Sequence, residues 1–234
     1  MKKIIILILI SFYSSFVVAD NDNKIIFEKA PIDLTNKSSL QKGAKIFINY
    51  CLNCHSAKYM RYNKLLDIGL SKKNIEENLL FTGKKIGDPM EISMPVKESK
   101  KWFGASPPDL SLVARSRGSD WIYNYMKGFY RDSSRKIGWN NLVYVNTAMP
   151  HILWELQGEQ ELNEKTGKLS LIKPGKLNQK EYDAVITDLT NYITYMSEPD
   201  QLKRKKMGIY VVGFLFLLLF LVVKLKQEFW KDIK

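Results

Sequence analysis

The chain has few of the residues from which most metal sites and disulfides are built, since only two cysteines and two histidines occur in 234 residues. A disulfide between Cys51 and Cys54, which are separated by two residues, would be strained and would leave the adjacent His55 unexplained. A zinc site normally needs a second pair of ligands, and only His151 remains for that purpose. This shortage argues against both a structural disulfide and a zinc site.

The two cysteines belong to the motif Cys51-Leu52-Asn53-Cys54-His55, which is typical of covalent c-type haem attachment. Two thiols about one helical turn apart can each bond to a vinyl group of one porphyrin. The histidine that follows then lies beneath the iron, so His55 is the predicted first axial ligand through a neutral imidazole nitrogen. A thioredoxin-like redox pair has the same spacing, but no βαβ pattern surrounds residues 40–60.

The N-terminus has the three zones of a secretory signal peptide: Lys2-Lys3, an apolar run over residues 4–10, and Val17-Val18-Ala19. The apolar run is too short to remain as a membrane anchor. We therefore expect residues 1–19 to be a cleaved signal peptide; an uncleaved anchor is the alternative, because Ala19 is weaker than a full A-x-A signal. Residues 20–202 would then form a haem domain exported to a bacterial periplasm.

Long apolar runs are otherwise confined to the C-terminus. Residues 207–223 contain no charge over 17 positions, which as a helix would measure roughly 26 Å, near the lower limit for spanning a bilayer. Together with the basic residues 203–206, they predict a collar and a single transmembrane helix over 203–223 in contact with lipid. Because the domain before it is exported, the tail 224–234 would end in the cytoplasm, in the bacterial inner membrane.

The net charge of +12 is concentrated around the predicted membrane segments. Residues 20–202 hold 26 Lys and Arg against 22 Asp and Glu, a net charge of only +4. No basic face interleaved with aromatic residues emerges there. The excess lies where anionic lipid would attract it, and we expect no nucleic-acid partner.

Helical patterns dominate residues 20–202. The clearest follows Asn178-x-x-Glu181, which resembles a capping box and precedes apolar residues at helical spacing. The fold class that we predict is mainly α: a cytochrome c-like haem domain with a single C-terminal transmembrane helix. The other expected elements are a helix capped by Ser39 that leads into the haem motif, a helix over 72–81, a helix opened by Ser119-Asp120, a hairpin pairing 160–163 with 168–172, and a loop over 82–111.

The second axial ligand decides what the haem can do. A methionine there is typical of electron carriers, whereas an open position suits gas binding or peroxide chemistry. Met94-Pro95 and Met149-Pro150 lie in loop-like settings where proline can fix the backbone, and spacing favours Met149 because it lies between the later helices. His151 is an alternative as a second imidazole ligand. The remaining candidates are Met60, which is too near in sequence, and Met90, Met126 and Met196.

Four blocks in this order resemble the cytochrome c1 family, the haem-carrying subunits of the quinol–cytochrome c reductase (bc1) complex. They are the region 43–65 with CLNCHSAKYMRYNKL, GASPPDLSLVARSRG at 104–118, AMPHILWELQG at 148–158, and the region 174–199 before the last apolar segment. The resemblance covers nearly all of the mature sequence. It is far more specific than the haem motif alone, which many unrelated cytochromes share.

The resemblance implies a role for each matching residue. Cys51 and Cys54 would form the thioethers of one covalent haem c, and His55 and Met149 would be its axial iron ligands. It further implies that Arg117, or less favourably Arg115, pairs with a haem propionate, since a guanidinium can grip a carboxylate in a fork. Pro107-Pro108 would form part of the pocket wall. The alternatives are ordinary solvated charges for the arginines and a simple turn for the prolines.

The implied function is one-electron transfer as the redox subunit of the bc1 complex, without independent turnover. A Rieske iron–sulfur protein, reduced by quinol at a cytochrome b subunit, would supply the electron, and a cytochrome c would accept it. Two alternatives remain: a freestanding membrane-anchored shuttle to a terminal oxidase, and a haem sensor or peroxidase with an open distal site.

One feature departs from the family pattern. Family members are often described as presenting acidic surface to a basic cytochrome c, whereas residues 20–202 are mildly basic. An acidic stretch after the Met149 loop could serve instead, formed by Glu155, Glu159, Glu161 and Glu164. The charge of the acceptor is therefore left open by the sequence.

Overall fold

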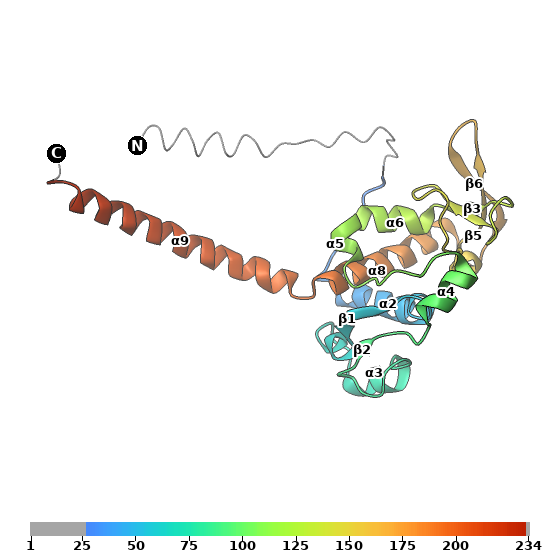
Figure 1. The fold of residues 1–234 in the computed structure, drawn as a ribbon, viewed down its shortest axis with the longest axis horizontal. Helices are drawn as coiled ribbons and strands as arrows, with labels where there is room; N and C mark the ends of the chain where they lie inside the picture. Colours follow the sequence, from blue (N-terminus) through green and yellow to red (C-terminus); the bar gives the residue numbers. More distant parts are fainter. Residues whose placement is uncertain (1–26, 233–234) are drawn as a thin grey trace.

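Two helices pack closely at the centre of the domain that a computed structural model describes over residues 27–232 (Figure 1). They are α2 (Lys37–Ile46) and α8 (Gln179–Ser197), and α6 (Ser119–Lys127) packs on α8 as well. The predicted signal peptide, residues 1–19, lies outside the described residues. The mainly α class with one C-terminal membrane helix is confirmed.

Glycine at position 43 allows α2 and α8 to approach this closely. A Cβ atom at Gly43 would overlap the backbone oxygen of Asp188 on α8. Beside this contact, Phe47 and Tyr192 are fully buried, with their ring centroids 5.6 Å apart. The side chain of Asn191 adds hydrogen bonds to Ser39 Oγ (3.0 Å) and the backbone oxygen of Asp33 (2.8 Å), which tie α8 to α2 and to the segment before it.

The structure has one of the two predicted helix caps and replaces the other. The predicted capping box is present at the start of α8, where the Asn178 side chain accepts from the N–H of Glu181 and the Glu181 side chain accepts from the N–H of Asn178. The prediction that Ser39 caps α2 is wrong. Asn36 caps it instead, because its Oδ1 accepts the N–H of Ser39 at 3.1 Å, which starts the helix three residues earlier.

The expectation of a continuous loop over 82–111 is also wrong. Within it lies α4 (Val96–Phe103), which begins directly after Pro95 and ends at Gly104 with φ +80°. A proline before the first helical turn and a left-handed glycine after the last one are the residues that bound a helix. The Gly and Pro content of this region therefore marks helix boundaries as well as loop.

The remaining elements are short and surround the α2–α8 pair. The predicted hairpin is confirmed as β5 (Gly158–Asn163) with β6 (Lys168–Pro174), and the short helix α3 (Lys72–Asn78) ends three residues before its predicted end. Not predicted were a π-helical turn η1 (Phe47–Cys51), a 3-10 turn η2 (Tyr62–Leu66), helices α5 (Val113–Arg117) and α7 (Trp154–Gln157), and the antiparallel pairs β1 (Ala57–Arg61) with β2 (Pro89–Met90) and β3 (Phe129–Arg131) with β4 (Trp139–Asn141).

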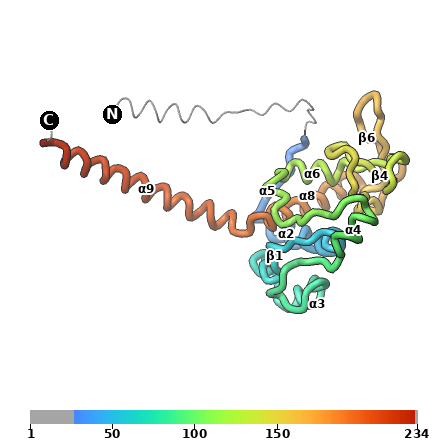
Figure 2. Tube along the Cα trace, in the orientation of Figure 1, coloured from blue at the N-terminus to red at the C-terminus, as the bar shows by residue number. Residues whose placement is uncertain are grey.

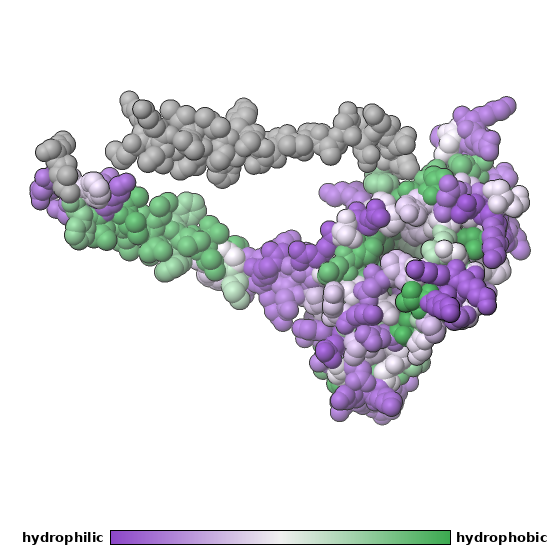
Figure 3. Space-filling view, in the orientation of Figure 1, coloured by the Kyte–Doolittle hydropathy of each residue, from purple (hydrophilic) through white to green (hydrophobic). Residues whose placement is uncertain are grey.

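The last helix projects from the domain as an isolated rod. Helix α9 (Gln201–Phe229) has 29 residues, so it is about 44 Å long at 1.5 Å per residue, and its most apolar window has a mean hydropathy of 2.6. That window is not buried by the rest of the described chain, and Figures 2 and 3 show it extending away from the domain with a hydrophobic middle. The predicted collar and span therefore form one continuous helix, long enough to cross a bilayer.

We predict that Gly43→Ala destabilises the domain by roughly 1–3 kcal/mol, because the added methyl group must force α2 away from α8. The thermal midpoint of the detergent-solubilised protein, followed by circular dichroism, measures this effect. Gly87→Ala is the matched control, because nothing lies within 4 Å of a Cβ at Gly87. Equal midpoints for the two variants would contradict the proposed close approach.

Candidate functional site

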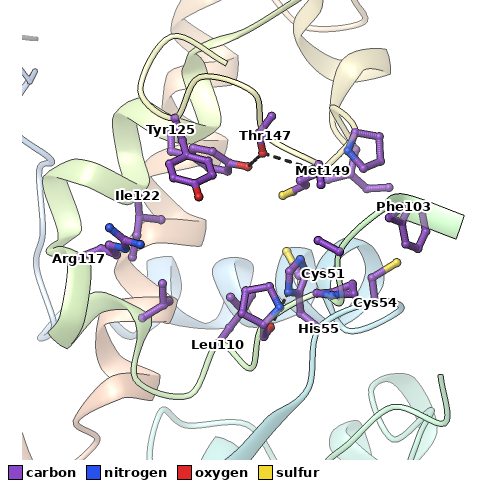
Figure 4. A pocket seen from close by; sticks show the side chains of 18 of the residues that line it. Cys51, Cys54, His55, Phe103, Leu110, Arg117, Ile122, Tyr125, Thr147 and Met149 are labelled. Carbon is purple, nitrogen blue, oxygen red and sulfur yellow. Dashed lines mark hydrogen bonds between the residues drawn. The ribbon is translucent and has the colours of Figure 1, made fainter. Parts of the chain in front are cut away.

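A cavity of about 360 Å³ lies between the haem motif, the segment after α4, helices α5 and α6, and the loop before α7 (Figure 4). Its volume lies within the range usual for cofactor sites. Six of the seven predicted site residues line it: Cys51, Cys54, His55, Pro108, Arg117 and Met149. The cavity therefore brings together residues almost 100 positions apart in the sequence.

The two cysteines are presented by the π-helical turn η1 and the tight turn after it. Leu52 N–H bonds to the Phe47 oxygen at 2.9 Å, and His55 N–H bonds to the Cys51 oxygen at 2.8 Å. Such π-turns occur frequently at functional sites. Burial raises the pKa of the Cys51 thiol to about 12, opposite to the lowered thiol pKa of a thioredoxin-like pair. The thiol environment thus argues against a dithiol redox role.

His55 is buried and held in one orientation. Its Nδ1 lies 2.8 Å from the backbone oxygen of Pro108, which can only accept, so Nδ1 carries the proton and donates. Nε2 is then the unprotonated nitrogen that a metal requires. Burial also lowers the pKa of His55, although the bond to Pro108 and the nearby Asp109 oppose that shift. The sequence suggested Pro108 only as pocket wall, since nothing in it shows where a backbone carbonyl points.

Met149 reaches the cavity from the side opposite His55, as Figure 4 shows. Its N–H lies 3.3 Å from Thr147 Oγ1, and the buried Tyr125 hydroxyl lies 2.8 Å from the same Thr147 oxygen. This chain of contacts ties the Met149 loop to helix α6. Met94, the alternative left by the sequence, is not among the residues that line the cavity. Thr147 and Tyr125 were not predicted. The Tyr125–Thr147 contact joins segments 22 residues apart, and no local pattern marked Thr147 as the partner of the Met149 N–H.

The two arginines of α5 lie in different places. Arg117 lines the cavity, with its guanidinium carbon 5.4 Å from the centre of the Trp121 ring. Arg115 lies outside the lining and pairs with Glu198, just after α8, at 3.5 Å. The structure thus brings Arg117 but not Arg115 to the other site residues.

His151 is also absent from the cavity lining. It is fully buried, stacks on Phe129 with ring centroids 4.8 Å apart, and meets Trp139 edge-on at 5.1 Å. Burial lowers its pKa to about 4, so it is neutral. Its position packs the base of the Met149 loop and does not support a role as second imidazole ligand.

The donor set of the cavity fits a c-type haem. Its wall is mostly apolar, with two free thiols beside an oriented imidazole, a thioether on the opposite side, and a guanidinium along the wall that could meet a propionate.

Comparison with known proteins agrees with this assignment. Residues 27–233 match the model of the Cytochrome C1 family. The chain belongs to the cytochrome c1 family. It is 42% identical to cytochrome c1 of Allochromatium vinosum over the full length of both chains. It is also 47% identical, over both full lengths, to a Nitrosomonas europaea protein named ammonia monooxygenase gamma subunit. Mitochondrial cytochrome c1 of Saccharomyces cerevisiae is 24% identical over 87% of this chain and 70% of its own.

Membership confirms several expectations drawn from the sequence. Cytochrome c1 proteins carry a covalently bound c-type haem and work as haem-based electron carriers of the bc1 complex in respiratory chains. The chain is accordingly a redox subunit of that complex. The C-terminal helix α9 makes it a membrane-anchored protein.

We predict that Thr147→Val lowers the free energy of unfolding by about 1–3 kcal/mol, because it leaves the buried Tyr125 hydroxyl and the Met149 N–H without partners. Tyr125→Phe should cost only about 0.5–1.5 kcal/mol, since the Thr147 hydroxyl keeps the Met149 N–H. Chemical denaturation of both variants measures the difference. An equal or larger loss in Tyr125→Phe would show that Thr147 does not connect the two.

Proposed function

We propose that this chain relays single electrons from the Rieske iron–sulfur protein to a cytochrome c within the bc1 complex. The observation that carries the proposal is the placement of His55 and Met149 on opposite sides of one apolar cavity, with both cysteines beside His55 (Figure 4). Two protein ligands leave no open position for a substrate, which suits an electron carrier. Cytochrome b and the Rieske protein are the expected partners within the complex.

Each residue has a distinct task in this proposal. Cys51 and Cys54 would hold the haem through two thioethers, and His55 and Met149 would bind its iron. Arg117 would pair with a propionate in a fork, and the Pro108 carbonyl holds the His55 ring so that Nε2 is the nitrogen free to bind the metal. When bound, the haem supplies a one-electron couple whose potential depends on these ligands and on the dry pocket.

We also propose an orientation in the membrane. Residues 1–19 would direct export, so that the haem domain, residues 20–202, lies in the periplasm. Residues 203–223 would then cross the inner membrane within α9, and the tail 224–234 would be cytoplasmic. The lysines at both ends of the apolar stretch can reach the headgroups of either leaflet.

We predict that Met149→Leu lowers the midpoint potential by on the order of 0.2 V, since axial ligands set haem potentials over about 0.8 V. The haem should remain attached, because both cysteines are unchanged. The reduced variant should also bind carbon monoxide, which the unaltered protein should not. Redox titration and carbon monoxide difference spectra measure these changes.

Met94→Leu is the matched control for this substitution. It removes a methionine that the sequence left as a candidate but that does not line the cavity, and its potential should equal that of the unaltered protein. A drop in the Met94 variant, with no change in the Met149 variant, would reverse the ligand assignment. Carbon monoxide binding by the unaltered reduced protein would instead favour the sensor or peroxidase alternative.

The complex purified in mild detergent tests the pathway. We expect cytochrome b and a Rieske protein to co-purify, and added quinol to reduce the c-type haem in reduced-minus-oxidised spectra. Extraction of the Rieske protein should abolish the reduction of the haem by quinol. Adding the Rieske protein back should restore that reduction. A c-type haem that purifies alone, and that quinol reduces only through other enzymes, would support the freestanding shuttle.

A further inference from the structure

We infer that the soluble acceptor docks at the mouth of the haem cavity through an acidic face, opposite a basic rim on this chain. The inference rests on the proposed electron-transfer function and adds the charge of the partner. We define the basic rim as Lys58, Lys97, Lys100 and Lys101. The partner is thus an electron carrier with clustered carboxylates around its own redox centre.

Three members of the basic rim lie on α4. Lys97, Lys100 and Lys101 have the i, i+3 and i+4 spacing that places side chains on one side of a helix, and all three are exposed. The helix ends at Phe103, which lines the cavity, so these charges border its mouth. The acidic residue of α4 is Glu98, in its first turn. The helix therefore presents a net positive surface beside the haem site.

Lys58 extends the rim on another side of the cavity. It lines a shallow pocket with Pro108 and Arg117, both of which also line the haem cavity. The adjacent carboxylate, Asp109, accepts the backbone N–H groups of Lys58 and Ser111. Within residues 27–232, no ion pair forms at any of the four rim lysines. Their charges are available to a partner.

Exposed apolar side chains lie on α4 beside these lysines and in and next to the cavity wall. Trp102 is 52% exposed, Tyr144 in the cavity wall is 52% exposed, and Val145 beside it is 62% exposed. Figure 3 shows hydrophobic side chains in the hollow between α6 and α4, with hydrophilic side chains over α4 next to them. An apolar centre with a charged edge is the usual composition of a protein interface.

Two of the four carboxylates in the acidic stretch that the sequence offered for a basic partner, Glu155 and Glu159, are neutralised within this chain. Glu155 pairs with Lys176 at 2.7 Å. Glu159 pairs with Arg131 at 2.8 Å and with Lys173 at 3.4 Å, and its side chain is only 15% exposed. Two of the four carboxylates are thus matched by cations, whereas within residues 27–232 none of the four rim lysines is paired. Charge complementarity therefore favours an acidic partner.

The experiment compares two forms of one acceptor with the purified bc1 complex. Native mitochondrial cytochrome c is basic, and succinylation of its lysines makes the same protein acidic. We expect the complex to reduce the succinylated form with the lower KM at low salt, and to lose this preference as ionic strength rises. Replacement of Lys97, Lys100 and Lys101 by Glu should raise the KM for the succinylated form roughly tenfold, with kcat little changed.

The matched control is Lys72→Glu with Lys73→Glu on α3, which contributes no residue to the cavity; its KM values should equal those of the unaltered complex. A lower KM for the native basic form, or no effect of the α4 substitutions, would overturn the basic-rim inference. Reduction of the c-type haem by quinol, measured without any soluble acceptor, tests the proposed function separately. If that reduction is intact, a wrong charge preference counts against the docking inference alone.

Discussion

The close packing of α2 on α8 is the contact on which the haem site depends. The haem motif follows α2 directly through η1, so the position of Cys51 and His55 is set by where α2 lies. Helix α8 in turn supports α6, which carries Tyr125, and Ile193 of α8 reaches the cavity itself. A side chain at Gly43 would shift one wall of the cavity against the other. The stability of the domain and the positions of the proposed haem ligands therefore both depend on Gly43.

The second constraint is that the two proposed axial ligands, His55 and Met149, come from distant segments. His55 is oriented by the Pro108 carbonyl, and Met149 by Thr147. Neither partner is itself a predicted ligand. Pro108 lies 53 residues from His55 in the sequence, whereas Thr147 is two residues before Met149 and is joined to α6 through Tyr125. Hydrogen-bond partners of this kind would hold the two side chains in place before haem binds. They would thereby limit structural rearrangement when the iron changes oxidation state. A one-electron carrier needs a fixed ligand geometry, because it binds no substrate at the iron.

Much of the fold could be predicted from local signals. The haem motif, the capping box at Asn178, the β5–β6 hairpin and the apolar stretch of α9 each depend on residues that lie close in sequence, and the structure has all of them. The missed elements have two different causes. The strands of β1–β2 pair across nearly thirty residues, which no local pattern identifies. Helix α4 was missed because Pro95 and Gly104 suggested a loop, although they flank the two ends of the helix.

The site residues also differ in how far the local sequence predicts them. The thiols and His55 follow from one motif. Spacing only favoured Met149 over Met94, and the choice between them needed either the family resemblance or the cavity itself. The most direct test of the account is acid–acetone extraction of the mature protein beside a variant with Cys51→Ala and Cys54→Ala. We predict that the haem stays with the unaltered protein and is extracted from the variant. Haem that is fully extracted from the unaltered protein would show that no thioether exists and would contradict the assignment of the site.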